Sequence, residues 1–413
     1  MTKAANGVVS FDEALKIVLD HADGVSMTTT ESLPLLACLN RVLAEAVLAD
    51  RDQPPFDRST RDGFAVRAAE FGAAALRIAG QVRAGEQWQG GALGDGAAIE
   101  IMTGAPIPEG ADSVVMIEHV ERSGGAISPQ GERTIRSGEN IVPRGSEARM
   151  GEAVLSAGTA IGGAEIALAA ACGRSALGVF RRPQVAIVAT GDELVEIDAV
   201  PESQQIRNSN SYGLAALVAE AGGDAVRLPI APDRRTELEE VIRSARRCEL
   251  MLLSGGVSMG EYDLVEEVLH GLGAEFFFTG VTVQPGKPVV FGRLPAAGDS
   301  PAQFFFGLPG NPVSTQVTFH CFVEPLLRAI AGAGSHEPRF AQATLAEDAT
   351  GKPGLMQVLP ARLTADRTLP EVKLVRWQGS GDLAANARAN CYAVLPPDKE
   401  RFAAGDVITI LLR

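Results

Sequence analysis

The sequence predicts a multidomain protein that combines a central α/β unit with two β-rich units. From Pro183 onward, short apolar runs alternate with helix-like stretches, which is typical of a doubly wound, mostly parallel sheet. Residues 51–139 and 341–413 instead carry short strand-like runs between Gly-, Pro- and Asp-rich turns. A length of 413 residues allows roughly two to four domains. We therefore expect an α/β core, an inserted small β domain and a C-terminal β-barrel-like domain.

The N-terminal third is expected to mix helices with short strands. Ser10 and Glu13 have the spacing of a capping box, and the apolar residues that follow recur at helical spacing, so a helix is expected over 11–22. Residues 35–49 predict a short helix and then an extended segment. Short apolar runs between glycine-rich turns predict the inserted β domain, and a helix is expected near 164–172.

The central unit is expected to alternate strands with helices. The expected strands cover 185–189, 225–230, 250–254, 275–278, 289–291 and 304–308, and the expected helices cover 211–221, 234–247, 261–272 and 313–330. In the tail, strands are expected over 357–359, 371–376, 391–395 and 407–412, which favour a small closed or half-closed β domain.

Charge and cysteine usage exclude several classes of protein. The chain has 37 basic and 51 acidic residues and a formal charge of -14, so we expect no nucleic-acid partner and no anionic membrane partner. Five widely spaced cysteines without a Cys-x-x-Cys pair predict neither a disulfide framework nor a zinc ribbon. No secretory h-region precedes the first helix, and a cytoplasmic location is expected.

Polar and glycine-rich loops follow the predicted central strands. They are Thr190-Gly191-Asp192-Glu193, Ala231-Pro232-Asp233, the run from Ser254 to Asp263, Gln284-Pro285-Gly286-Lys287-Pro288, and Pro309-Gly310-Asn311-Pro312. Carboxyl ends of parallel strands share one edge of the sheet, where ligands bind. Gly and Ser supply donors for phosphate oxygens, carboxylates suit a hard divalent cation, and Lys287 adds positive charge.

Each loop also has a purely structural interpretation. Asp192, Asp233 and Glu261 fit helix N-caps or first-turn acids, Gly255-Gly256 fits a tight turn, and the Pro309–Pro312 segment fits a stiff loop. Several such loops on one edge favour a phosphate-bearing ligand with Mg²⁺, although the pattern does not give the reaction.

The combination of motifs resembles the molybdopterin molybdenumtransferases, the family of bacterial MoeA and the gephyrin E domain. Six motifs occur in the family's order: Phe-Asp-x-Ser-x-x-Asp-Gly-Phe-Ala at 56–65, Met-Thr-Gly-Ala-Pro at 102–106, Thr-Gly-Asp-Glu-Leu at 190–194, Ser-Gly-Gly-Val-Ser at 254–258, Pro-Gly-Lys-Pro at 285–288 and Gly-Leu-Pro-Gly-Asn-Pro-Val-Ser at 307–314.

The resemblance implies a discontinuous linker and dimerisation domain at 1–50 and 142–180, an inserted β domain at 51–141, a molybdopterin-binding α/β domain at 181–332 and a C-terminal β domain at 333–413. It also implies an elongated homodimer. The implied transferase inserts molybdenum from molybdate into adenylated molybdopterin, releases AMP and forms molybdenum cofactor, assisted by Mg²⁺. Molybdopterin adenylyltransferase and molybdoenzyme maturation proteins are the candidate partners.

The resemblance also assigns roles to residues. Glu193, Asp233 and Asp263 would handle the cation and the substrate, and Lys287 would neutralise phosphate or molybdate. Asp62 and Thr103 would reach the crevice from the partner subunit. The remaining expected substrate contacts are Thr190, Gly191, Ser254, Gly255, Gly256, Ser258, Pro309, Asn311, Pro312 and Arg362. Two alternative functions remain open, a molybdopterin adenylyltransferase and a non-catalytic carrier or scaffold of the same fold.

Overall fold

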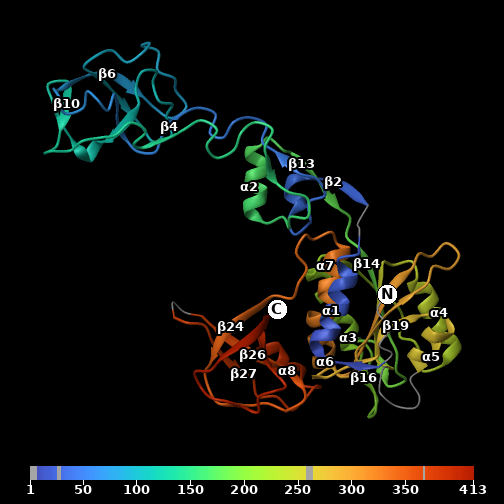
Figure 1. Cartoon of the computed structure of the whole chain (residues 1–413). Helices are drawn as coiled ribbons and strands as arrows, with labels where there is room; N and C mark the ends of the chain where they lie inside the picture. Colours follow the sequence, from blue (N-terminus) through green and yellow to red (C-terminus); the bar gives the residue numbers. More distant parts are fainter. Residues whose placement is uncertain (1–6, 26–28, 257–263, 366–367) are drawn as a thin grey trace.

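The computed structural model describes residues 7–25, 29–256, 264–365 and 368–413. The chain is elongated (Figure 1), with a central α/β unit, a C-terminal β unit beside it, and a small β unit at the far end of a narrow stalk. Within the described residues, none of the helices combines the length and the apolar character needed to cross a bilayer.

The central sheet has the strand order β17-β14-β18-β23-β22-β19. Its strands are β14 (Gln184–Ala189), β17 (Asp224–Arg227), β18 (Leu250–Ser254), β19 (Glu275–Phe278), β22 (Val290–Leu294) and β23 (Gln303–Leu308). The pairs β14–β17, β14–β18 and β18–β23 are parallel, whereas β22 and β19 close one edge in antiparallel fashion. The expected mostly parallel sheet is therefore confirmed.

Helices cover both faces of this sheet. One face packs α3 (Ser209–Glu220), α6 (Pro312–Thr318) and α7 (Glu324–Ile330) against alternate residues such as Ile187 and Leu252. The other face packs α4 (Arg235–Ala245) and α5 (Leu264–Gly271) against the intervening residues, such as Val188 and Leu253. The side chains alternate because a strand turns successive residues to opposite faces.

The helix expected over 313–330 is continuous in direction but irregular. Residues Phe319–Val323, between α6 and α7, form a π-helical turn. Pro325, the second residue of α7, follows that turn and has no N–H to donate to the preceding helical turn. Of the helix expected over 261–272, residues 261–263 lie outside the described part, and β17 ends at Arg227 instead of 230.

Helix α1 (Phe11–Ala22) begins with the expected capping box. The Ser10 N–H donates to Glu13 Oε2 at 3.0 Å, and the Glu13 N–H donates to Ser10 Oγ at 3.2 Å. The buried side of α1 joins the central core against α7 and the π-helical turn, and β1 (Val8–Val9) pairs with β20 (Gly280–Val281). Residues 8–22 therefore pack with the central unit, although the expected domain division groups them with the stalk.

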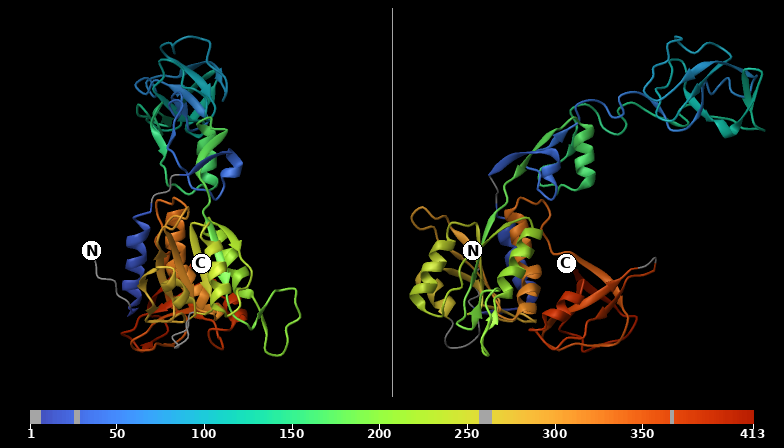
Figure 2. Two further views of the ribbon diagram at one scale, coloured as in Figure 1. Left: turned by 90° about the vertical axis from the view of Figure 1, so that its right-hand side faces the viewer. Right: turned by 180° about the vertical axis from the view of Figure 1, so that it is seen from behind.

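The stalk and the distal unit follow. The stalk pairs β2 (Thr30–Pro34) with β13 (Ala176–Phe180) and β3 (Val47–Leu48) with β12 (Ala153–Leu155), and packs η1 (Leu35–Cys38) against α2 (Gly163–Ala171). The distal unit is a sheet of order β8-β5-β7-β6-β10-β9. Its strands are β5 (Gly63–Val66), β6 (Leu76–Val82), β7 (Ala97–Ile101), β8 (Ser113–Met116), β9 (Val120–Ser123) and β10 (Ala126–Pro129). Figure 2 shows how far this unit lies from the central sheet.

The C-terminal unit is a closed barrel. Its strands β24 (Phe340–Leu345), β26 (Met356–Thr364), β27 (Glu371–Leu374), β28 (Cys391–Leu395) and β30 (Val407–Leu412) pair in the order β26-β27-β24-β30-β28, and β28 returns to β26. Strand β24 and the short helix α8 (Leu383–Arg388) were not expected from the sequence. Helix α8 contacts α6, so the barrel packs against the central unit.

Candidate active-site crevice

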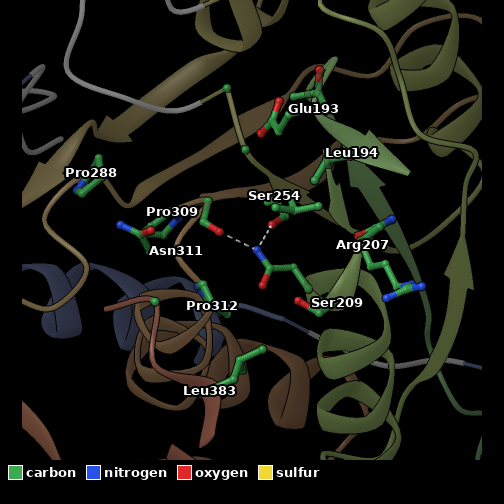
Figure 3. Close-up of a pocket in the computed structure, with 18 residues that line it drawn as sticks. Glu193, Leu194, Arg207, Ser209, Ser254, Pro288, Pro309, Asn311, Pro312 and Leu383 are labelled. Atoms are coloured by element: carbon green, nitrogen blue, oxygen red, sulfur yellow. Dashed lines mark hydrogen bonds between the residues drawn. The ribbon is translucent and has the colours of Figure 1, made fainter. Parts of the chain in front are cut away.

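A cavity of about 630 Å³ opens at the carboxyl edge of the central sheet (Figure 3). It is bounded by the loops after β14, β18 and β23, by the start of α3, and by the short ribbon of β15 (Leu194–Val195) and β16 (Ile206–Arg207). Among the expected site residues, the cavity lining includes Thr190, Glu193, Ser254, Gly255, Gly256, Pro309, Asn311 and Pro312. Loops that are distant in sequence thus meet at one edge, as expected.

Asn210 ties two of these loops together. Its side-chain nitrogen donates to Ser254 Oγ at 2.9 Å, at the end of β18, and to the Gly310 carbonyl at 2.8 Å, after β23. The preceding Asn208 caps helix α3, with its side-chain oxygen accepting from the Ser211 N–H at 3.2 Å. The start of α3 therefore fixes the position of Ser254, at the end of β18, relative to Gly310, in the loop after β23.

The turn after β18 requires glycine. Gly255 has φ +91°, and a Cβ at this position would lie 2.4 Å from the Thr190 carbonyl oxygen. L-residues rarely adopt that backbone region, and the contact would overlap a neighbouring strand end. The β14 and β18 loops can approach this closely only because residue 255 has no side chain.

Two of the expected cation ligands lie at this edge. Glu193 lines the cavity. Asp233 does not line it but contacts a residue that does, because its Oδ1 accepts a hydrogen bond from the Thr190 hydroxyl at 2.8 Å. The Asp233 N–H donates to Asp192 Oδ1 at 3.2 Å, so Asp192 shapes the loop as well. Gly191 lies between Thr190 and Glu193 without lining the cavity. Asp263 and Ser258 are outside the described residues, which hold no cluster of three or more acidic, histidine or cysteine side chains suited to a metal.

The positively charged side chain that lines the cavity is not the one expected from the sequence. Lys287 is exposed and does not line the cavity, although its neighbour Pro288 does. Arg207, on β16, is the one cationic side chain among the described residues that line it. Nothing in the sequence around Arg207 indicated that it would line the cavity, because it lies in a two-residue strand outside the motifs.

The loop before α6 is rigid. Pro312 is the first residue of the helix, as expected, and the Thr315 hydroxyl donates to the Pro309 carbonyl at 2.6 Å. The barrel closes this side of the crevice. The Val313 N–H donates to the Ser380 carbonyl at 2.9 Å, and Gly381 and Leu383 line the cavity. This contribution was missed because α8 was not expected.

Asp62 and Thr103 lie far from the crevice of their own chain, in the distal unit (Figure 2). They pair with each other: the Thr103 N–H and hydroxyl donate to Asp62 Oδ1 at 2.6 and 2.8 Å. These two hydrogen bonds hold the pKa of Asp62 below its ordinary value, and the bond from the Thr103 backbone N–H contributes more than the bond from its hydroxyl. Gly63, beside it, has no room for a Cβ, which would lie 1.9 Å from the Val115 carbonyl oxygen.

Arg362 also lies apart from the crevice. It belongs to β26 of the barrel and lines a different cavity. The structure therefore gathers the central-unit residues at one site and leaves Asp62, Thr103 and Arg362 elsewhere in the chain.

The doubly wound sheet with polar, glycine-rich loops at its carboxyl edge defines an α/β ligand-binding protein whose crevice is completed by a β-barrel. Three family models match the chain in succession: the MoeA N-terminal region (domain I and II) over 9–173, a probable molybdopterin binding domain over 186–329, and the MoeA C-terminal region (domain IV) over 342–412.

Relatives extend over nearly the whole chain. A molybdopterin molybdenumtransferase from Haemophilus influenzae is 33% identical, over 93% of this chain and 94% of that protein. One from Nostoc sp. is 34% identical, over 94% and 89%. The crystal structure of a molybdopterin biosynthesis MoeA protein from Pyrococcus horikoshii OT3 has a TM-score of 0.78 and 29% identity, and covers 98% of this chain and 100% of that one. The chain belongs to the molybdopterin molybdenumtransferase family.

Proposed function

We propose that this chain inserts molybdenum from molybdate into adenylated molybdopterin, releasing AMP and forming molybdenum cofactor. The observation that carries the proposal is the crevice of about 630 Å³, in which glycine and hydroxyl donors meet a carboxylate and an arginine. This lining suits a ligand that carries phosphates, and the volume falls within the range of about 300–1,000 Å³ typical of small-molecule sites. The name shared by the full-length relatives supports the same reaction.

The residues of the crevice would share the work. Ser254, Gly255 and Gly256 would donate to phosphate oxygens, while Pro309, Asn311 and Pro312 would shape the pterin side. Thr190 would hold Asp233 in place through its hydroxyl. Cleavage of the phosphoanhydride adds water to phosphorus and breaks the bond to the bridging oxygen, so that AMP leaves. The two dithiolene sulfurs then replace oxygen on molybdenum, and that oxygen leaves as water with the thiol protons.

Mg²⁺ would be held by Glu193 and Asp233, with Asp263 as the third expected ligand. Two carboxylates fit this ion, which in proteins is bound through one or two carboxylates together with substrate phosphates and water. When bound, the ion would offset charge on the phosphate oxygens. Arg207, which lines the cavity, would add to the neutralisation first expected from Lys287.

We also propose a homodimer in which the distal unit of one subunit serves the crevice of the other. The Asp62–Thr103 pair lies far from the crevice of its own chain, and both residues belong to family motifs. A second subunit would bring an exposed carboxylate and hydroxyl to the open side. The five cysteines are free and buried, which suits a reducing compartment, and we propose a cytoplasmic location.

One assay tests the proposed reaction. Purified protein is mixed with adenylated molybdopterin, Mg²⁺ and molybdate, and AMP and metal-loaded pterin are followed. Molybdate-dependent AMP release is expected. Adenylation of free molybdopterin from ATP would instead identify an adenylyltransferase. Tight pterin binding without turnover would identify a carrier or scaffold.

A further inference from the structure

A second cavity, of about 700 Å³, lies on the C-terminal barrel and is strongly basic. Among the described residues, its lining includes four cations, Arg362, Lys373, Arg376 and Arg388, with Glu371 as the one carboxylate and Thr364 as a hydroxyl donor. The chain as a whole carries a formal charge of -14, so this cluster runs against the overall balance. By comparison, Arg207 is the one basic side chain among the described residues that line the crevice of the central sheet.

Strand register concentrates the positive charge on one face. Arg362 on β26 and Lys373 on β27 are directly opposite each other across the antiparallel pair, and Thr364 is opposite Glu371 two residues along. Residues two apart share a face, so these four side chains line the same side of the sheet. The intervening pair, Leu363 and Val372, faces the barrel core, where Val372 is buried and the partly buried Leu363 packs against it. The basic side chains therefore point outward from a fixed scaffold.

Two cations opposite each other weaken a strand pair unless an anion neutralises them. Lys373 has Glu347 at 2.8 Å. Among the described residues, the one hydrogen bond of the Arg362 guanidinium is a long contact, 3.5 Å, to the Arg388 carbonyl. In the described part of the chain, Arg376 and Arg388 form no ion pair with a carboxylate. Within the described residues, no carboxylate lies at ion-pair distance from these three guanidinium groups, although Arg388 is near enough to Asp382 to lower its pKa. Guanidinium pairs with phosphate in a bidentate geometry.

We infer that this cavity is an anion-binding site for a small polyanion of the oligophosphate type, separate from the crevice of the central sheet. The inference stands independently of the proposed function, because it rests on the register of β26 and β27 and on charges of the barrel alone. A cavity of this volume encloses a small molecule, and these three guanidinium groups match a ligand with several negative oxygens.

The test is amine footprinting with inorganic pyrophosphate, using the full chain without Mg²⁺ at 0.15 M salt, where distant surface charges are screened. Lys399 serves as the reference: like Lys373, it has a carboxylate partner, at 2.7 Å against 2.8 Å, and its side chain is 49% exposed against 63% for Lys373. Lys399 also lies over the Phe402 ring, so the change in each rate on adding pyrophosphate is compared instead of the rates themselves. Pyrophosphate is expected to slow acetylation of Lys373 several-fold and to leave Lys399 unchanged, as read by mass spectrometry. Inorganic phosphate should protect less, because it carries fewer oxygens.

Variants make the test specific. Arg376→Gln and Arg388→Gln are exposed substitutions, and each should weaken pyrophosphate protection of Lys373 by about tenfold, the loss expected for one charge-assisted contact. Arg401→Gln removes the same charge from an exposed site elsewhere on the barrel and should leave protection intact. Melting temperatures of all three variants identify any that fail to fold. Equal protection of both lysines, no protection of Lys373, or protection by polyglutamate alone would each overturn the inference.

Discussion

The side-chain nitrogen of Asn210 lies 2.9 Å from Ser254 Oγ, and this contact joins two residues that are 44 positions apart in the chain. The same nitrogen lies 2.8 Å from the carbonyl oxygen of Gly310, which is 100 positions from Asn210 in the chain. One amide thus connects the start of α3 to the end of β18 and to the loop after β23. Because its donors are already used, Asn210 acts as a positioning residue for the crevice.

Replacing Asn210 with Ala should loosen the crevice more than it destabilises the fold. Two hydrogen bonds are lost at a partly exposed position, so the free energy of unfolding should fall by about 1–2 kcal/mol. The affinity for the pterin should fall about tenfold, because the loops that line the crevice lose their common anchor. Denaturation and ligand titration measure the two effects. Asn390→Ala is the control, because Asn390 also makes two hydrogen bonds, both to Leu363 in the barrel. Similar losses of affinity in both variants would contradict the positioning role.

Gly255→Ala should disrupt the crevice through both strain and overlap. Its Cβ would meet the Thr190 carbonyl oxygen at 2.4 Å, at a φ of +91°. We expect a loss of about 2–4 kcal/mol in the free energy of unfolding, together with impaired pterin binding. Gly354→Ala provides the matched control, since Gly354 has φ +80° with open space around it. That control should lose about 1 kcal/mol from the φ penalty alone. Equal losses in the two variants would rule out the overlap with Thr190.

Mixed dimers test the proposal that Asp62 and Glu193 act from different subunits. Asp62→Ala and Glu193→Ala should each abolish most turnover as homodimers. Random mixing after co-expression should restore about a quarter of the wild-type activity, since half the dimers are mixed and each then contains one intact site. Activity is measured by molybdate-dependent AMP release. If co-expression restores nothing while mixed dimers form, the two side chains do not act from different subunits.

The partly buried Glu324 should make stability sensitive to acid. Burial alone would raise the pKa of this carboxyl, but the hydrogen bond from His320 at 2.8 Å and the nearby Arg339 and Arg328 outweigh burial and hold the pKa below its ordinary value of 4.5. A carboxyl with a lowered folded-state pKa stabilises the fold above its unfolded pKa, and that contribution disappears as pH falls through the folded value.

Glu324→Gln should therefore be about 1–3 kcal/mol less stable than wild type at pH 7, with the difference shrinking below about pH 4.5. Urea denaturation across this range measures it. A difference that stays constant with pH would show that the carboxylate charge contributes nothing.

The thiols should be inert in the folded protein. All five cysteines are free and buried, and burial raises the pKa of the Cys38, Cys248 and Cys321 thiols and that of Cys391 to about 11. Because the thiolate is the reactive form, a disulfide reagent at pH 8 should modify the native chain at least tenfold more slowly than free cysteine. All five should react after denaturation. Rapid reaction of one thiol in the native state would locate an opening near that residue.

Local signals in the sequence predicted much of the fold. The Ser10–Glu13 capping box, the Pro312 start of α6 and the alternation of strands with helices are confirmed because each depends on neighbours within a few residues. The same signals missed the π-helical turn at Phe319–Val323, whose packing against α1 and the barrel involves residues far away in the sequence. Helix α8 was missed because its six residues are too few for a periodic pattern.

The sequence by itself determined the family, the kind of sheet and the loops that gather at its carboxyl edge, because motif order and strand direction are written along the chain. Only the tertiary structure decided that Asn210 braces those loops, that Arg207 faces the cavity where Lys287 was expected, and that Arg362 belongs to a second, basic cavity. These placements depend on contacts between segments tens of residues apart, and the angles at which separate units pack are not encoded in any short stretch of residues.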